Sequence, residues 1–287
     1  MEKHRIPASE LIINPDGSIY HLHLKPEDLA SLVFTVGDPD RVAQVSQYFD
    51  RIEIKKQKRE FVTHTGYLRG QRVTVMSTGM GTDNIEILMT ELDALVNVDL
   101  DNRIVKDEKT ALKIVRLGTS GSMQANIPVG SLLASEIGIG MDTLMQFYPF
   151  LAEDQSIAEL IRQELGLGFL PYQASASSDL LGKLDKRFFR GVTLTCPGFY
   201  APQGREVRLK PRFEDMISSL SSIESKGKRL TNFEMETAGY YAMGRLLGHE
   251  MLSLNAIVAN RPKNEFDKNA AKTVDTLIHT ALELFVA

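Results

Sequence analysis

Residues 72–96 read RVTVMSTGMGTDNIEILMTELDALV, and this stretch gives the first indication of the fold. Its first part, Arg72–Thr78, is short, rich in β-branched residues and followed by Gly79, which is typical of a β-strand. After the glycines, Asp83 is expected to cap a helix, with Glu86 three residues later completing a capping-box-like pair. Apolar residues then recur at helical spacing: Ile85, Leu88, Leu92, Leu95 and Val96. The stretch therefore predicts a strand, a glycine-rich loop and an amphipathic helix in succession.

The same alternation continues along the chain. Three further short, β-branched segments are predicted to be strands: Ile114–Gly118, Val192–Cys196 and Leu252–Ala259. A helix is expected over Phe233–Leu247, ended by Gly248. Another is expected at the C-terminus from its apolar face: Val274, Leu277, Ile278, Ala281, Leu282 and Phe285. This order predicts an α/β fold with helices on both faces of a central sheet and a ligand site where loops leave the strand ends.

The composition limits the kind of protein. The chain has 287 residues, 43% of them hydrophobic, and a formal net charge of −4. It has enough apolar material for a sizeable core, and the lack of basic blocks argues against nucleic acid as a partner. One cysteine excludes an internal disulfide framework, and neither a secretory signal nor a run of about 20 apolar residues is recognisable. We therefore expect a soluble, cytoplasmic protein without a membrane partner, folded as one compact domain.

A candidate anion-binding loop begins at Gly37, directly after the strand-like run Leu32–Val36. Asp38 suits the N-cap of a helix and Pro39 suits its first position. Free N–H groups at a helix start attract anions, and Arg41 in the first turn would add donors suited to phosphate. A plain helix start with a solvent-facing arginine explains the same residues, so this motif alone leaves both interpretations open.

A second candidate loop follows the predicted strand that contains Arg116. An arginine within an apolar strand is unusual, because a buried charge is costly unless it is paired. Residues 118–121, Gly-Thr-Ser-Gly, are expected to form a turn whose hydroxyl and N–H groups cradle an anion. The alternative is an edge strand with its arginine in water. Neither candidate loop matches the common phosphate-loop or dinucleotide-binding signatures.

Two more segments carry groups that suit a nucleoside. Residues 232–238, NFEMETA, place two acids around Met235 at an expected helix start. A carboxylate can bind sugar hydroxyls, and a methionine can pack against the sugar. Residues 199–205, FYAPQGR, combine an aromatic ring, an amide and an arginine that can stack on uracil and read its acceptor–donor–acceptor edge. An ordinary helix cap and an ordinary Pro/Gly turn remain the alternatives.

The remaining reactive side chains predict little chemistry. His21 and His23 are not accompanied by further ligands at metal-site spacing, so no metal is expected. Cys196, at the end of a predicted strand, is expected to be buried and unreactive.

Taken together and in this order, the motifs resemble those of the nucleoside phosphorylase superfamily, most closely the uridine phosphorylases. The shared elements are GDPDRV at 37–42, REF at 59–61, STGMG at 77–81, RLGTSG at 116–121, FYAPQGR at 199–205, FEMETA at 233–238 and the pair Asn260-Arg261. The resemblance begins near His21, so we expect an N-terminal extension, residues 1–20, and a single phosphorylase-like domain, residues 21–287. It implies a three-layer α/β/α sandwich whose central mixed sheet is partly barrel-like.

The resemblance also implies an activity, that of a pentosyltransferase which cleaves uridine reversibly to uracil and ribose 1-phosphate. Inorganic phosphate would be a co-substrate that attacks C1′ through an oxocarbenium-like transition state, with no cofactor or metal. Phosphate would be bound by Gly37, Arg41, Arg59, Arg116 and Thr119. The ribose would be bound by His21, Met235 and Glu236, and the base by Phe199, Gln203 and Arg205. The implied catalytic residues are Arg116, Arg205 and Glu236.

The resemblance further implies a homo-oligomer, either a hexamer built from dimers or a dimer. Arg59 and His21 would then reach the site of a neighbouring subunit. A purine phosphorylase or a nucleosidase is one alternative, although Ala256–Arg261 contains no acid that could protonate a purine. A non-catalytic nucleoside-binding relative is another, because the loop Thr82–Asn84 departs from the sequence usual in the family. The stretch Asn97–Lys113 looks longer than usual and is expected to be a helix end followed by a surface loop.

Overall fold

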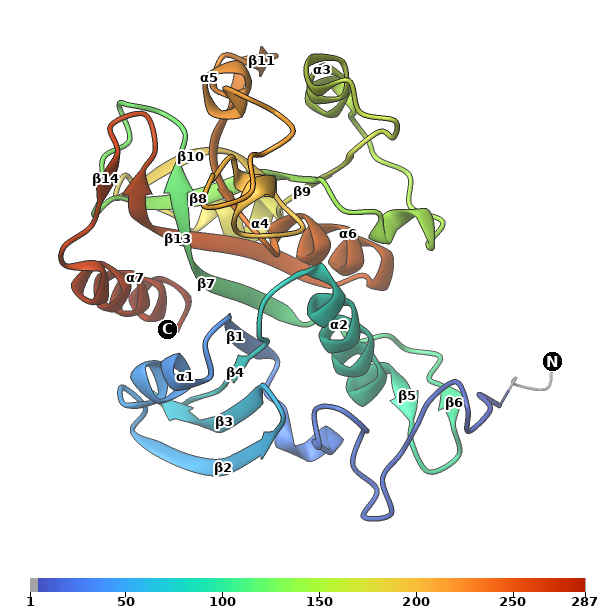
Figure 1. Cartoon of the computed structure of the whole chain (residues 1–287). Helices are drawn as coiled ribbons and strands as arrows, with labels where there is room; N and C mark the ends of the chain where they lie inside the picture. The colour runs from blue at the N-terminus through green and yellow to red at the C-terminus, as the bar shows by residue number, and fades with distance from the viewer. Residues whose placement is uncertain (1–4, 287) are drawn as a thin grey trace.

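The computed structural model describes residues 5–286. Its strands are β1 (Leu32–Val36), β2 (Arg51–Lys58), β3 (Phe61–Leu68), β4 (Gln71–Ser77), β5 (Val98–Asp99), β6 (Ile104–Val105), β7 (Lys113–Ser122), β8 (Leu132–Gly140), β9 (Tyr172–Ser175), β10 (Phe188–Thr195), β11 (Glu224–Ser225), β12 (Lys228–Glu234), β13 (Glu250–Asn260) and β14 (Glu265–Phe266). Its α-helices are α1 (Pro39–Ser46), α2 (Thr82–Asn97), α3 (Ser156–Leu165), α4 (Ser178–Gly182), α5 (Met216–Ser221), α6 (Thr237–Leu247) and α7 (Ala270–Phe285). Strands and helices alternate as predicted (Figure 1).

One large mixed sheet contains most of the strands, in the order β11-β12-β10-β8-β13-β7-β1-β4-β3-β2. Strand β12 also pairs antiparallel with β7, through Asn232 with Ser122 and Phe233 with Gly121. This extra pairing closes β7, β13, β8, β10 and β12 into a ring, while β1 to β4 continue the sheet outward from β7. In Figure 1 the strands β1 to β4 accordingly lie at one end of the molecule, with β7 and β13 running through its middle. The predicted mixed, partly barrel-like sheet is confirmed.

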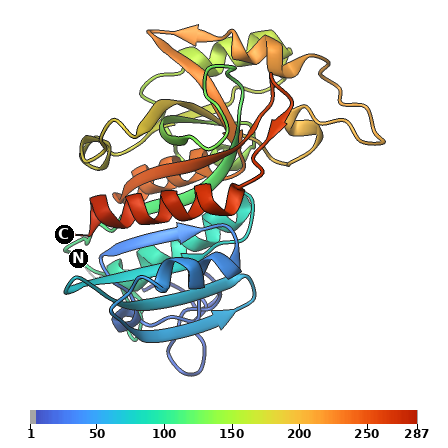
Figure 2. The same cartoon turned by 90° about the vertical axis from the view of Figure 1, so that its left-hand side faces the viewer.

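Alternating side chains of the strands bury opposite faces of the sheet. In β1, Leu32, Phe34 and Val36 belong to a core formed with α1, α4 and α7. Val33 belongs to the core on the other face, formed with α2 and α6. Figure 2 shows α7 lying along its face of the sheet. A third core packs α3 and α5 against β10 and β12. The expected arrangement of helices on both faces of the sheet is therefore confirmed.

The start of α2 differs from the prediction. Strand β4 ends at Ser77 and helix α2 begins at Thr82, close to the expected positions. The N-cap, however, is Gly81, whose φ is 97°, and no side chain caps the helix. Asp83 lies inside the first turn, so its predicted capping role is wrong. Gly81 takes this place because its positive φ is accessible mainly to glycine.

The start of α6 also differs. The predicted helix Phe233–Leu247 begins only at Thr237, although Gly248 ends it in the left-handed conformation as expected. Phe233 and Glu234 instead complete β12, which pairs in parallel with β10 up to Glu234. Sequence periodicity could not place this boundary because apolar residues continue from the strand into the helix.

The N-terminal segment and the long stretch after α2 contact each other. The short strands β5 and β6 form a hairpin within the predicted surface loop, and Arg5 pairs with Ile104 in that hairpin. The N–H of Ile6 donates to the carbonyl of Arg103 (2.8 Å), and Leu11 is buried in the core that contains α2. The predicted division at residue 20 stays a prediction. Within residues 5–286, every helix is too short or too polar to cross a bilayer.

Candidate active site

A cavity of about 550 Å³ opens at the edge of the sheet where the parallel strands β1, β4, β7 and β13 end. This is the position predicted for a ligand site in an α/β fold. Nine of the residues proposed from the sequence line it: Gly37, Arg41, Arg116, Thr119, Phe199, Gln203, Arg205, Met235 and Glu236. Residues that are far apart in the chain are therefore brought into one cavity.

The loop after β1 forms the anion-attracting end of the cavity. Helix α1 has Asp38 as its N-cap, with the Asp38 carboxylate accepting from the N–H of Asp40 at 2.9 Å, and Pro39 at its first position. Arg41 lies in this first turn, and its Nη1 is 3.4 Å from the carbonyl of Leu117. Burial lowers the pKa of Arg41 and the positive charge of Arg116 lowers it further. An anion between the two arginines would relieve that repulsion.

Arg116 is buried in β7 and held from two sides. Its Nη2 contacts a carboxylate oxygen of Glu234 at 3.0 Å and one of Glu236 at 2.5 Å. Its Nη1 donates to Oδ1 of Asn255 at 3.1 Å and to Oγ of Ser253 at 3.3 Å. Burial alone would lower the pKa of Arg116, but the two carboxylates outweigh it and raise the pKa above its ordinary value. Strand β7 lies between β13 and β1 and Arg116 is buried, so the alternative of an edge strand with its arginine in water is wrong.

The predicted Gly-Thr-Ser-Gly turn does not exist. Residues 118–121 continue β7 and pair with β13, with Gly118 opposite Asn255. A Cβ atom on Gly118 would lie 2.0 Å from Nη1 of Arg116, because the guanidinium folds back over this glycine. The glycine therefore makes room for the arginine rather than reversing the chain. Thr119 still lines the cavity.

Two carboxylates line the cavity between β12 and α6: Glu234 ends the strand and Glu236 is the N-cap of the helix. Glu236 accepts the N–H of Gly81 at 2.8 Å, which ties it to the loop after β4. Burial raises the pKa of Glu236, Arg116 opposes the rise and the neighbouring Glu234 adds to it. Glu234 accepts from the hydroxyl of Thr195 at 2.7 Å and from the N–H of Glu236 at 2.9 Å. Glu234 was absent from the sequence-based set, because only the structure reveals its contact with Arg116.

Phe199, Gln203 and Arg205 form the opposite end of the cavity. Nη1 of Arg205 donates to Oε1 of the buried Gln203 at 2.7 Å, and its guanidinium carbon lies 3.8 Å from the centre of the Phe199 ring. Burial and the nearby charge of Arg261 lower the pKa of Arg205 to about 10. Arg205 thus covers one face of Phe199 and orients the Gln203 amide.

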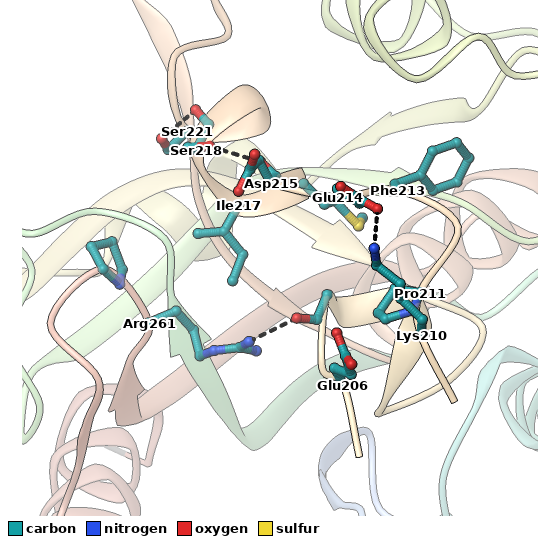
Figure 3. A pocket seen from close by; sticks show the side chains of 13 residues that line it. Glu206, Lys210, Pro211, Phe213, Glu214, Asp215, Ile217, Ser218, Ser221 and Arg261 are labelled. Atoms are coloured by element: carbon teal, nitrogen blue, oxygen red, sulfur yellow. Dashed lines mark hydrogen bonds and ion pairs between the residues drawn. The ribbon is translucent and has the colours of Figure 1, made fainter. Parts of the chain in front are cut away.

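Arg261 supports this end from behind and was not among the proposed site residues. Its guanidinium donates to the backbone carbonyls of Gln203 at 3.0 Å and of Gly204 at 3.1 Å. Figure 3 shows Arg261 on the wall of a second cavity, of about 660 Å³, on the other side of this turn. The pair Asn260-Arg261 was part of the motif set, and that was the available sequence signal.

Two proposed site residues lie outside this cavity. Arg59 is exposed in the turn between β2 and β3, with φ 55°. Nδ1 of His21 lies 2.7 Å from Oε1 of Glu91, a residue of α2. Their expected contribution to a neighbouring subunit's site stays a prediction. Cys196 is buried, and burial raises the pKa of its thiol far above the ordinary value, which fits the expected unreactive residue.

The chain is similar to known proteins over most of its length. A family model described as the phosphorylase superfamily matches residues 31–286. A curated uridine phosphorylase of Thermococcus kodakarensis is 29% identical over 274 residues, which cover 94% of this chain and 87% of that protein. The crystal structure of a Trypanosoma brucei nucleoside phosphorylase, described as showing uridine phosphorylase activity, is 31% identical with a TM-score of 0.84, covering 95% of this chain and 99% of that one. A curated purine nucleoside phosphorylase of Caldanaerobacter subterraneus is 26% identical over 274 residues, covering 92% and 98%.

Proposed function

Because this chain belongs to the phosphorylase superfamily, we propose that it is a uridine phosphorylase, which converts uridine and phosphate reversibly to uracil and ribose 1-phosphate. One observation carries the proposal. A single cavity is lined by two arginines, Arg41 and Arg116, by Glu236, which contacts Arg116, and by the hydrogen-bonded pair Gln203–Arg205. The three parts of the reaction, phosphate, sugar and base, each have chemically suited residues in this one cavity.

Phosphate is bound at the cationic end. The N–H groups at the start of α1, the guanidinium of Arg41 and the Nε–H of Arg116 are the donors. Nε–H is the donor of Arg116 that has no hydrogen-bond partner among residues 5–286. This charge set needs no metal ion to hold the phosphate.

Glycosidic bond cleavage then proceeds without a covalent enzyme intermediate. An oxygen of phosphate bonds to C1′ as the C1′–N1 bond breaks, and the electron pair of that bond passes to uracil. The sugar carries positive charge in the transition state, as in glycoside hydrolysis, and the phosphate and Glu236 stabilise it. Negative charge gathers on the carbonyl oxygens of the departing base, where Arg205 donates hydrogen bonds. Uracil becomes neutral by taking up a proton.

The base end favours a pyrimidine over a purine. Gln203 can accept from the uracil N3–H and donate to a carbonyl oxygen. The carboxylates that line the cavity are Asp38, the N-cap of α1, and Glu234 and Glu236, which both contact Arg116. Asn260 belongs to Ala256–Arg261, the segment in which an acid that protonates a purine would be expected. It is buried and donates to the carbonyls of Gln124 and Ile127. Within residues 5–286, the acids that line this cavity therefore lie at the helix start or against Arg116, and we expect none of them to protonate a purine ring.

We also propose a homo-oligomer, a hexamer built from dimers or a dimer, in which Arg59 and His21 complete a neighbour's site. The rigid attachment of His21 to Glu91 supports this, because a side chain fixed at the surface can be presented to another subunit. A cytoplasmic location, a role in pyrimidine salvage and the lack of a cofactor belong to the same proposal.

The test is uracil release from uridine with and without inorganic phosphate, beside a parallel reaction with inosine. We expect phosphate-dependent release from uridine and little from inosine. Release without phosphate would indicate a nucleosidase, and faster cleavage of inosine would indicate a purine phosphorylase; either result contradicts the proposal. Tight uridine binding without turnover would identify a binding protein instead.

A further inference from the structure

The five strands that close on themselves, β7, β13, β8, β10 and β12, each contribute at least one buried polar side chain to a continuous chain of hydrogen bonds. Each of these side chains bonds one from the neighbouring strand. We call this set the polar ring; in order, its members are Arg116 of β7, Asn255 of β13, Ser135 of β8, Thr193 of β10, Asn232 of β12 and Ser120 of β7. Four of the six, Asn255, Ser135, Thr193 and Asn232, are 0% exposed.

The hydrogen bonds of the polar ring run in one direction. The hydroxyl of Thr193 donates to Oδ1 of Asn232 at 2.8 Å, so the hydroxyl of Ser135 is the donor in its 2.5 Å contact with Thr193. Ser135 in turn accepts from Nδ2 of Asn255 at 3.2 Å. Because the Asn255 nitrogen is taken by Ser135, its oxygen faces Arg116, at 3.1 Å from Nη1. The ring therefore fixes which way the Asn255 amide points.

We propose that Asn255 is a positioning residue for phosphate binding, whose neutral amide oxygen fixes the Arg116 guanidinium without adding negative charge to it. Asn255 is not among the residues that line the cavity, so it acts only through Arg116. Arg116 already contacts the carboxylates of Glu234 and Glu236. A third carboxylate would give the guanidinium an excess of negative neighbours and repel an incoming phosphate. The inference rests on the proposed role of Arg116 in phosphate binding.

The decisive variant is Asn255→Asp, which keeps the size and an acceptor oxygen for Arg116, adds charge and replaces the Nδ2 donor to Ser135 by an oxygen. We expect the KM for phosphate to rise about tenfold or more, because the added charge repels phosphate; a tenfold rise corresponds to roughly 1.4 kcal/mol. The KM for uridine should change by less than about twofold, because Asn255 does not reach the sugar or the base. The melting temperature without phosphate should fall, because a third carboxylate is buried beside Glu234 and Glu236, so the selectivity of the KM change, not its mere presence, carries the test. An unchanged KM for phosphate, or equal changes in both KM values, would overturn the inference.

Two further variants distinguish a positioning effect on phosphate binding from a general loss of stability. Thr193→Val breaks the polar ring at a residue separated from Arg116 by Asn255 and Ser135. We expect it to raise the KM for phosphate selectively but less than Asn255→Asp does. Asn97→Leu removes another buried asparagine, which bonds Asp93 and Thr110 far from the ring, and should lower stability while leaving the KM for phosphate unchanged. A selective phosphate effect in Asn97→Leu would contradict the inference.

A binding measurement distinguishes failure of this inference from failure of the proposed function. Inorganic phosphate should raise the melting temperature of the unaltered protein, and should raise it less in Asn255→Asp. If uridine is not cleaved but this difference persists, the proposed function is wrong and the positioning role stands. If uridine is cleaved with phosphate but both proteins are protected equally, the positioning role is wrong.

Discussion

Gly118 is a residue whose missing side chain serves the site. Its substitution by alanine would place a Cβ atom 2.0 Å from Nη1 of Arg116, and the guanidinium cannot move without leaving four polar contacts. We expect Gly118→Ala to lower kcat/KM by at least about 100-fold, comparable to the loss of a preorganised charge donor. Steady-state kinetics at varied phosphate concentration measure this effect.

A matched control exists for that variant. Gly182, at the end of α4, has no atoms within 4 Å of the position its Cβ would take. Gly182→Ala should leave kcat/KM and the melting temperature unchanged within error. Full activity in Gly118→Ala would show that the arginine reorganises freely, which contradicts the geometry described here.

Gln203 is expected to decide which base is accepted. It is buried and held in orientation by Arg205, so its removal leaves the polar edge of uracil unpaired. Gln203→Ala should lower the ratio of uridine to inosine turnover about tenfold, with most of the loss on uridine. Competition assays with both nucleosides measure the ratio.

Another buried glutamine provides the comparison. Gln124 donates to the carbonyls of Ser221 and Leu230, and it does not line the active-site cavity. Gln124→Ala should reduce stability and leave the ratio as it was. An unchanged ratio in Gln203→Ala would show that another residue reads the base.

At the residue scale, nine of the eleven site residues predicted from the sequence line the cavity, but the sequence did not show which of them contact one another. Arg116 could be identified because a charge between apolar residues demands compensation. Its compensating residues, Glu234 and Glu236, lie 118 and 120 positions further along the chain. Pattern and spacing are local, so they cannot show which distant strand delivers the carboxylates.

At the scale of elements, short β-branched runs and amphipathic helices were predictable because their patterns are local. The wrong predictions concern segments whose amino-acid composition is typical of a different structure from the one they form. Residues 118–121 have the glycine and hydroxyl content of a turn, yet they form a strand because small residues are needed beneath Arg116 and inside the barrel. Residues 233–236 look like a helix start, but pairing with β10 keeps Phe233 and Glu234 extended.

The N-terminal segment is expected to be part of the folded unit. Leu11 is buried, and the hairpin β5–β6 bonds the chain at Arg5 and Ile6. Deleting residues 1–17 should lower the melting temperature by roughly 5 °C, since burying one leucine contributes about 2 kcal/mol. Differential scanning calorimetry measures the change. The half-exposed Ile12 provides the control, and Ile12→Ala should change the melting temperature by much less.

At the scale of the whole molecule, buried phenols and the buried thiol predict a loss of stability in alkali. Burial is the main cause that raises the pKa of four side chains: Tyr172, Tyr240, Tyr241 and Cys196. The unfolded chain loses these protons above about pH 8.5 for the thiol and about pH 10 for the phenols, while the folded protein keeps them. The unfolded state then binds fewer protons, so the free energy of unfolding falls as the pH rises.

Urea unfolding between about pH 8 and about pH 11 measures this slope, which should approach about 1.4 kcal/mol per pH unit for each group that titrates only when unfolded. Tyr240→Phe removes one such group, together with its 2.8 Å bond to the hydroxyl of Thr35. This variant should be less stable at neutral pH but show a shallower alkaline slope. Identical slopes for both proteins would mean that Tyr240 ionises in the folded state.

The antiparallel pairing of β12 with β7, which closes the ring of strands, has a consequence for biosynthesis. The ring strands are made in the order β7, β8, β10, β12 and β13, but β13 lies between β7 and β8. The ribosome must therefore release the chain beyond Asn260 before the barrel can close and before Arg116 can meet Asn255. Until then the nascent chain exposes unpaired strand edges, the state in which large proteins are most prone to aggregate. The cavity that Arg116 lines is thus among the last features to form as the protein is synthesised.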